Sequence, residues 1–289
     1  MTNTKSFVKN DRLILRLERI GCYIVLILFS ILCLFSFYIL VINASRAHPD
    51  IMKGFSLLPG KSMIVNWNNL KANPNLPVVR SIFNSFFISS CCAVLATYFS
   101  ALAAYGVHVY NFKGRNFAFS FIMFVMMVPS QISTLGLISM MNSWHLIDTY
   151  IPLIIPSISS ASVVFFMKQY LESTLPIEIV EASRIDGASE FRTFNEIVLP
   201  ILKPAMAVQG IFSFVTAWNN YFVPSLIISS AAKKTLPILI AQLRSADYLK
   251  FDMGQVYCMV AVAIVPVLII FLILSKNIVG GVTLGSVKG

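Results

Sequence analysis

Six long apolar windows constrain the fold of this chain more than any other feature. They cover approximately residues 20–42, 82–105, 117–139, 151–170, 205–228 and 256–279, and none contains a run of charged residues. A helix needs about 20 mostly apolar residues to cross a bilayer. Backbone groups in lipid must also pair within the segment, and the windows lack the alternation of barrel strands. We therefore predict an all-α polytopic membrane protein with six transmembrane helices.

Composition agrees with this class and indicates one domain. Only 12% of the residues are charged, whereas soluble proteins carry roughly 25%. The first window, Ile20–Ile42, is longer than the core of a cleavable signal peptide, so we predict that it stays as a span. The outer loop over residues 43–78 is too short and too rich in turns to form another domain. We predict a single transmembrane domain over residues 1–289.

The distribution of Lys and Arg predicts the orientation of the spans. With the N-terminus inside, thirteen Lys and Arg belong to the cytoplasmic side and nine to the outer side. Both termini and the segment 171–204 are then expected in the cytoplasm. The net charge of +10 suits loops beside anionic lipids. We expect no nucleic-acid partner, because the chain lacks a basic stripe with interleaved aromatic residues.

Acidic residues gather in one polar stretch between the fourth and fifth windows. Half of the twelve Asp and Glu lie within residues 172–196: Glu172, Glu178, Glu181, Asp186, Glu190 and Glu196. Pro176 suits the first turn of a helix, and Glu178 and Glu181 then lie near its positive end. Gly187 suits the left-handed cap that ends such a helix. We predict a short helix followed by a glycine elbow.

A second short helix is expected after Gly187. Ser189 can cap it, and its apolar side is expected to carry Phe191, Phe194 and Val198. Two prolines are expected to break this helix before the fifth span, Pro200 and Pro204. Short polar helices are marginal in water and need a surface to pack against. Their carboxylates favour a cytoplasmic protein over lipid headgroups, because interfacial helices are usually basic.

This polar stretch resembles the EAA loop of the permeases of ABC importers. That signature reads EAA, three residues, G, nine residues and I-x-LP, and every spacing fits from Glu181 to Pro200, with Ser183 in place of the second alanine as the only departure. In that family the loop contains the coupling helix, which seats in a cleft of the ATP-binding subunit. The resemblance implies a type I importer permease fold and a coupling site of five residues: Glu181, Ala182, Ser183, Asp186 and Gly187.

Softer motifs resemble the carbohydrate-uptake branch of that family, and its maltose-type second permease subunit in particular. They are residues 128–156, 174–189, AWNNYFVP at 217–224 and the ending GGVTLGSVKG. The resemblance implies an oligosaccharide importer in the bacterial cytoplasmic membrane. Its other parts would be a homologous second permease subunit, a dimer of ATP-binding subunits and an extracytoplasmic sugar-binding protein. The alternative is another solute, such as glycerol phosphate, a peptide or an amino acid.

The sequence offers no catalytic or metal-binding pattern. The stretch GFSLLPGKS at 54–62 places five residues between Gly54 and Gly60, where a phosphate-binding loop requires four. We therefore expect no cofactor on this chain, and the resemblance implies ATP and Mg at the partner ATPase. No Asp, Glu, Lys or Arg lies near the middle of a window, which argues against a secondary transporter, the remote alternative.

The fifth window carries polar residues at helical spacing. Such groups in a bilayer face a water-filled path or bond to another helix, and the sequence leaves both open. Trp218 and Tyr221 can likewise stack on a sugar ring or pack against other helices. The possible substrate path consists of Gln209, Ser213, Thr216, Asn219 and Asn220.

Overall fold

The computed structural model describes residues 3–246 and 251–285, and the side chains of residues 15–246 and 251–275. Every regular element within these ranges is a helix, so the predicted class is confirmed. Five helical segments among them are long and apolar enough to cross a membrane: Leu15–Ala44, Val78–Val109, Ile151–Thr174, Glu190–Trp218 and Met253–Ser275. The bent pair Arg115–Met126 and Gln131–Ser143 makes a sixth if both helices belong to one span.

The chain divides into two compact units. One unit comprises residues 1–69 and 250–261, and the other comprises residues 70–249 and 262–289. The first contains α1 (Asn3–Ala44), α2 (His48–Met52), most of α3 (Met63–Ala72) and the beginning of α14 (Met253–Gly285). The single transmembrane domain over residues 1–289 stays a prediction, because one membrane domain can contain two compact units.

In the first unit, polar side chains hold the segment that follows α1. Asn66 Nδ2 donates to the carbonyl oxygens of Ala44 and Arg46 at 2.9 and 3.0 Å. Gly254 lies so close to this segment that an added Cβ would stand 2.8 Å from the Arg46 carbonyl oxygen. Only glycine allows such an approach. Before this segment, the side chains of residues 15–38 are exposed all round the helix, as an apolar span in lipid requires.

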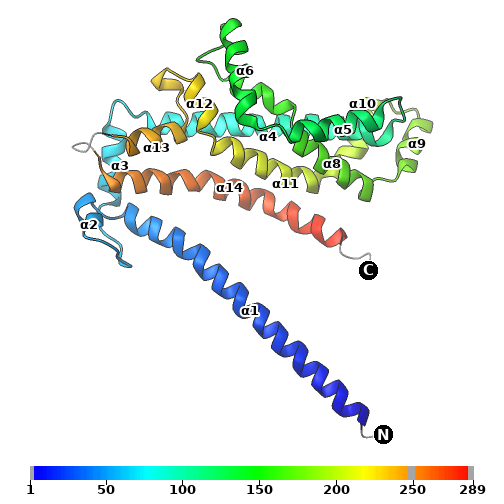
Figure 1. The fold of residues 1–289 in the computed structure, drawn as a ribbon, viewed down its shortest axis with the longest axis horizontal. Coiled ribbons are helices and arrows are strands. Elements are labelled where there is room, and N and C mark those ends of the chain that lie inside the picture. Colours follow the sequence, from blue (N-terminus) through cyan, green and yellow to red (C-terminus); the bar gives the residue numbers. More distant parts are fainter. Residues whose placement is uncertain (1–2, 247–250, 286–289) are drawn as a thin grey trace. The chain divides into compact units, whose positions relative to one another are not determined.

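The second unit is built on three long helices. These are α4 (Val78–Val109), α8 (Ala161–Thr174) and α11 (Leu199–Trp218), which lie side by side (Figure 1). α5 (Arg115–Met126) packs against α8. Trp218 on α11 donates its indole N–H to the Ala263 carbonyl on α14 at 3.1 Å. Fully buried side chains between the long helices include Met167, Leu171 and Leu202.

Short elements occupy the two ends of the second unit (Figure 1). At one end lie α9 (Ile177–Ile185), α10 (Glu190–Arg192) and the π-helical turn η2 (Thr193–Val198). At the other end lie α12 (Phe222–Ile227), η3 (Ala231–Lys233) and α13 (Leu236–Arg244). The remaining elements are α6 (Ser130–Ser143), α7 (Ile151–Ile154) and η1 (Ile155–Ile158). We call the two ends the α9 end and the α12–α13 end.

The third predicted window, residues 117–139, is not a straight helix. Its two halves, Arg115–Met126 and Gln131–Ser143, meet at an angle of 96°. Pro129 lies at the bend with extended backbone, at φ −60° and ψ 123°. A proline has no N–H to continue the first helix, so the chain turns there and a new helix begins.

The fifth predicted window, residues 205–228, is wrong at both ends. The helical segment begins at Glu190 and ends at Trp218, and Pro200 and Pro204 lie within it. Pro200 lies in the first turn of α11, immediately after the π turn in which the Leu199 N–H reaches back to the Phe194 carbonyl. The wider π turn just before Pro200 alters the hydrogen-bond pattern there, and prolines inside helices are tolerated in membrane proteins. The predicted break at the two prolines is therefore wrong.

At the α12–α13 end, the carboxylate of Asp148 joins two loops that are distant in sequence. Its Oδ1 accepts the N–H groups of Ser229 and Ser230, both at 3.0 Å. Its Oδ2 accepts the Ser230 hydroxyl at 2.5 Å and the Lys233 ammonium at 3.1 Å. These bonds, those of Ser230 first, hold the pKa of Asp148 well below its usual range. The residue has a φ of +59°, a left-handed conformation that Asp and Asn tolerate better than most residues.

We predict that Asp148→Ala lowers the free energy of unfolding by about 1.5–3 kcal/mol, the range for hydrogen bonds to a charged group. Asp148→Asn should cost less, because an amide oxygen still accepts both N–H groups. Since folding lowers this pKa, the contribution is present above the ordinary value of 3.8 and disappears as the pH falls through the lowered folded value. Thermal unfolding of the detergent-solubilised protein measures the effect, and an unchanged midpoint for Asp148→Ala would contradict it.

Candidate functional site

The helix α9 ends in a Schellman motif at the predicted glycine elbow. Gly187 has a φ of +79°. The N–H of Ala188 donates to the Ser183 carbonyl, and the N–H of Gly187 donates to the Arg184 carbonyl, both at 3.0 Å. These are the two bonds that define the motif, and its left-handed residue favours glycine. The predicted cap at Gly187 is confirmed, and we use "the elbow" for residues 181–189.

The second predicted helix is capped as expected but is not short. The hydroxyl of Ser189 accepts the Arg192 N–H at 3.4 Å. The helix then continues through η2 into α11 without a break. Phe194 and Val198 are buried, but Phe191 is 72% exposed, so the predicted shared side is wrong for Phe191. Phe191 belongs to α10, ahead of the π turn over residues 193–198, whereas Phe194 and Val198 both lie inside that turn.

Four of the five predicted coupling residues lie on the surface of the elbow. They are Glu181, Ala182, Asp186 and Gly187. The fifth, Ser183, is buried, and its hydroxyl lies 2.7 Å from the hydroxyl of Thr193. The serine that departs from the EAA signature therefore has an internal hydrogen-bond partner. Thr193 was not predicted, because ten residues and a turn separate it from Ser183.

Large apolar side chains accompany the carboxylates of the elbow and of the helix that follows it. Ile185 is 87% exposed and Phe191 is 72% exposed. Residues of this size are usually covered in a finished assembly, and exposed apolar patches rimmed by polar groups are typical of protein interfaces. The elbow and the start of α10 thus carry exposed apolar side chains near the exposed carboxylates of Glu181 and Asp186.

A charged cluster ties the elbow to the end of α4. The Glu190 carboxylate accepts the Arg184 Nε–H at 2.7 Å and the Tyr105 hydroxyl at 3.0 Å. Bonding to Glu190 raises the pKa of the Arg184 guanidinium above its already high value. The pKa of Tyr110, whose ring lies beside Arg184, is raised first by burial and then by Glu190. Arg184 therefore stays charged and Tyr110 neutral at any physiological pH.

The predicted polar face of α11 lines one pocket in the second unit, with a volume of about 280 Å³. Four of the five predicted path residues take part: Gln209, Ser213, Thr216 and Asn220. Three serines that the sequence analysis missed complete the polar lining: Ser157, Ser160 and Ser162. The sequence signal that could have identified these serines is their close spacing, just before α8 and in its first turn. None of the described residues that line this pocket is charged.

The remaining candidates of the Trp-Asn stretch lie elsewhere. Asn219 is exposed and does not line this pocket. Trp218 is buried and stacks on Phe214 with ring centroids 5.7 Å apart, so it is a packing residue. Tyr221 lines a separate pocket of about 360 Å³ at the α12–α13 end, with Lys234 and Gln242 among its other residues.

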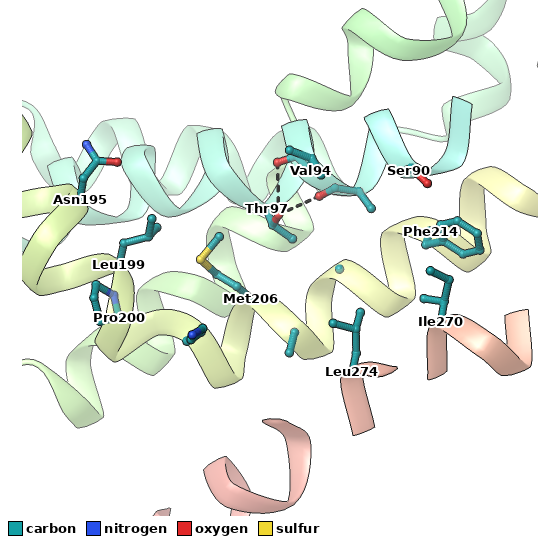
Figure 2. Close-up of a pocket in the computed structure, with 14 residues that line it drawn as sticks. Ser90, Val94, Thr97, Asn195, Leu199, Pro200, Met206, Phe214, Ile270 and Leu274 are labelled. Carbon is teal, nitrogen blue, oxygen red and sulfur yellow. Dashed lines mark hydrogen bonds between the residues drawn. The ribbon is translucent and has the colours of Figure 1, made fainter. Parts of the chain in front are cut away.

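Another pocket of the second unit is lined mainly by apolar residues. It has a volume of about 550 Å³ and lies between α4, α11 and α14, as Figure 2 shows. Its wall includes Val94, Met206 and Leu274, while Asn195 lies at one end. The Thr97 hydroxyl donates to carbonyls within its own helix. Most of this wall suits apolar contacts, and the residues that line it also include Ser90, Asn195 and Lys203.

Comparisons with known proteins agree with these features. The family model "Binding-protein-dependent transport system inner membrane component" matches residues 94–282. The arabinooligosaccharides transport system permease protein AraQ of Bacillus subtilis is 34% identical over 276 residues, which are 94% of this chain and 96% of that protein. The sn-glycerol-3-phosphate transport system permease protein UgpE of Yersinia pestis is 30% identical over 267 residues, 91% of this chain and 95% of that protein.

Two further comparisons support the same family and fold. The lactose transport system permease protein LacG of Rhizobium radiobacter is 29% identical over 273 residues, 94% of this chain and 97% of that protein. A solved bacterial ABC transporter, described as importing the acidic polysaccharide alginate, superposes with a TM-score of 0.76 at 19% identity and covers 90% of this chain; the match spans 96% of that chain. These matches confirm the resemblance predicted from the EAA spacing. This chain belongs to the family of inner membrane components of binding-protein-dependent transport systems, the permeases of ABC importers.

Proposed function

We propose that this chain is the permease subunit of an ATP-driven oligosaccharide importer and forms half of its translocation path. The observation that carries the proposal is the elbow, a rigidly capped acidic turn with exposed apolar side chains at one end of the second unit. In a member of this family, such a turn is suited to seat in the ATP-binding subunit. The names of the relatives AraQ and LacG support a sugar as the solute.

In this proposal the elbow is the coupling site, with Glu181, Ala182, Ser183, Asp186 and Gly187 as its residues. Nucleotide binding and hydrolysis occur on a dimer of ATP-binding subunits, which hold ATP and Mg. This chain supplies no catalytic group and binds no cofactor. The ATPase shifts the permease between inward-open and outward-open states, because nucleotide favours one of them.

The proposed arrangement in the bacterial inner membrane follows from the same site. The α9 end, the N-terminus and the C-terminus lie in the cytoplasm. The α12–α13 end faces an extracytoplasmic sugar-binding protein. A homologous second permease subunit supplies the other half of the path.

The chemistry of that pocket favours a neutral sugar over glycerol phosphate. Its polar lining consists of hydroxyl and amide groups, which both donate to and accept from sugar hydroxyls. A phosphate is usually held by Arg or Lys, and none of the described residues that line the pocket is a cation. Glycerol phosphate, the solute in the name of the relative UgpE, therefore fits this wall less well.

We predict that Glu181→Lys removes the ATP-binding subunit from the purified complex. Reversing a charge inside an interface costs at least about 1.4 kcal/mol, which is a tenfold loss of affinity. Pull-down from detergent with this chain as bait measures the retained subunit. Glu18→Lys makes the same change of charge at an exposed position on α1 and serves as the matched control.

Wild type and the Glu18→Lys control should retain the ATP-binding subunit together with a second permease. If wild type brings down no ATP-binding subunit, the proposed function is wrong. If Glu181→Lys retains as much subunit as wild type, the importer assignment stands but Glu181 is not part of the coupling site.

We also predict that Asn220→Leu lowers sugar uptake about fivefold, because it removes roughly one neutral hydrogen bond, worth about 1 kcal/mol. Asn219→Leu makes the same change one residue earlier, outside the pocket, and should leave uptake unchanged. Since Asn220 also accepts the Val223 N–H at 3.3 Å, Thr216→Val provides a second test that leaves this bond intact. Uptake of arabinotriose and of glycerol 3-phosphate into intact cells is measured in parallel.

Arabinotriose uptake that falls in Asn220→Leu and in Thr216→Val, but not in Asn219→Leu, supports the path. Equal uptake in all three variants contradicts it. Uptake of glycerol 3-phosphate in place of arabinotriose would show that the sugar assignment is wrong while the importer remains.

A further inference from the structure

Three elements meet at the carboxylate of Glu190. One oxygen bonds to Arg184 on α9 at 2.7 Å, and the other bonds to Tyr105 on α4 at 3.0 Å. Glu190 itself begins α10, which leads into α11. Tyr105 is only 3% exposed, so this contact lies where the core of the helical bundle meets the elbow. We call the three residues the Tyr105–Glu190–Arg184 joint.

Aromatic rings hold the joint on the side of α4. The Tyr105 ring lies 5.4 Å from the Phe194 ring and 5.9 Å from the Tyr110 ring, measured between centroids. The Arg184 guanidinium carbon lies 5.4 Å from the centroid of the Tyr110 ring. A cation at this distance from an aromatic ring is attracted to it. Arg184 therefore contacts α4 through Tyr110 as well as through the shared carboxylate.

A second connection lies one residue earlier on α9. The buried Ser183 hydroxyl bonds to the Thr193 hydroxyl in η2. The last turn of α9 is thus attached to α4 through Arg184 and to the beginning of the α11 segment through Ser183. α9 cannot move relative to these two helices without breaking a charged hydrogen bond or leaving buried hydroxyls unpaired, and both are costly.

The same two helices supply most of the wall of the polar pocket. α4 contributes Cys92 and Ala96, and α11 contributes five residues between Gln209 and Ala217: Gln209, Phe212, Ser213, Thr216 and Ala217. A displacement of α9 that is passed to α4 and α11 therefore reaches the pocket through two continuous helices. The exposed ion pair Arg192–Glu196, with a separation of 2.8 Å, joins the adjoining α10 and η2 of one continuous helical segment and does not bridge separate helices.

We infer that the Tyr105–Glu190–Arg184 joint transmits movement of the elbow to α4, so that Glu190 and Tyr105 are positioning residues for coupling and not part of the docking surface. This inference rests on the proposed function. It assigns the transmission to contacts within this chain, which run from the partly exposed side chains of Arg184 and Glu190, 37% and 46% exposed, to the buried Tyr105. Without the joint, the ATP-binding subunit should still dock and hydrolyse ATP, but the pocket should no longer respond to nucleotide.

The test follows the pocket directly and needs no identified solute. Ser213→Cys is introduced into a variant in which the five native cysteines are replaced by alanine, and the full complex with its ATP-binding subunits is purified. Labelling of Cys at position 213 by a water-soluble maleimide is measured without nucleotide and with ATP and vanadate. ATP hydrolysis and retention of the ATP-binding subunit are measured on the same samples.

In the otherwise unchanged complex, we expect nucleotide to change the labelling rate by about fivefold or more, as coupled sites typically do. Tyr105→Phe, which keeps the ring, and Glu190→Gln should each reduce this change at least about threefold while hydrolysis and subunit retention persist. The nucleotide response of the double variant should be no smaller than that of Glu190→Gln alone, because both substitutions affect the same contact between Tyr105 and Glu190. Glu196→Gln, which breaks the exposed pair Arg192–Glu196, should behave as the unchanged complex does.

Two results would overturn the inference. One is an unchanged nucleotide response in both Tyr105→Phe and Glu190→Gln. The other is loss of the ATP-binding subunit from Glu190→Gln, which would place Glu190 in the docking surface. Absence of the ATP-binding subunit from the unsubstituted complex would instead refute the proposed function, so the two failures are distinguishable.

Discussion

The lack of water in a bilayer decides most of this architecture, because every backbone N–H and carbonyl within it must find a partner in the protein. Long helices satisfy that demand along their whole length. The difficulty moves to the places where a helix ends or bends. There the chain uses a small number of polar side chains: Asn66 pairs two free carbonyls, Asp148 pairs two free N–H groups, and Ser189 caps the segment that becomes α11. Each of these residues fixes a turn that the long helices alone would leave open.

The same constraint separates the chemistry of the second unit into zones. Charged groups such as Asp148 and Glu190 lie at the helix ends, where they bond to loops or to other ends. The core between α4, α8 and α11 is apolar, and the polar part of the lining of the pocket beside it consists of hydroxyl and amide groups. As proposed, this neutral lining lets a hydrated neutral solute pass without a buried charge that would bind it or repel it. The movement that we infer is conveyed instead where charges and rings fasten α9 to α4.

Local patterns predicted from the sequence are confirmed where one residue controls the geometry. Gly187 ends α9 because a left-handed residue is needed there, and Ser189 caps the next helix because its hydroxyl accepts an N–H. Gln209, Ser213 and Thr216 line one pocket because α11 preserves their spacing, and Asn220 joins them from just beyond the end of the helix. Predictions that summed several local rules are wrong: Pro200 and Pro204 do not end the helix, and Phe191 does not share the buried side with Phe194. The π turn over residues 193–198 contains Phe194 and directly precedes α11 with Pro200, whereas Phe191 lies before this turn.

The sequence by itself determined the class of fold, the family and the position of the elbow. Hydrophobic length, the EAA spacing and a glycine at a helix end are local properties of the chain. Only the tertiary structure decided which residues cooperate across long separations: Ser183 with Thr193, Tyr105 with Glu190, and Ser157 with the face of α11. Those pairings depend on how α4, α8 and α11 pack. Packing depends on the shapes of many side chains together, which no single spacing in the sequence records.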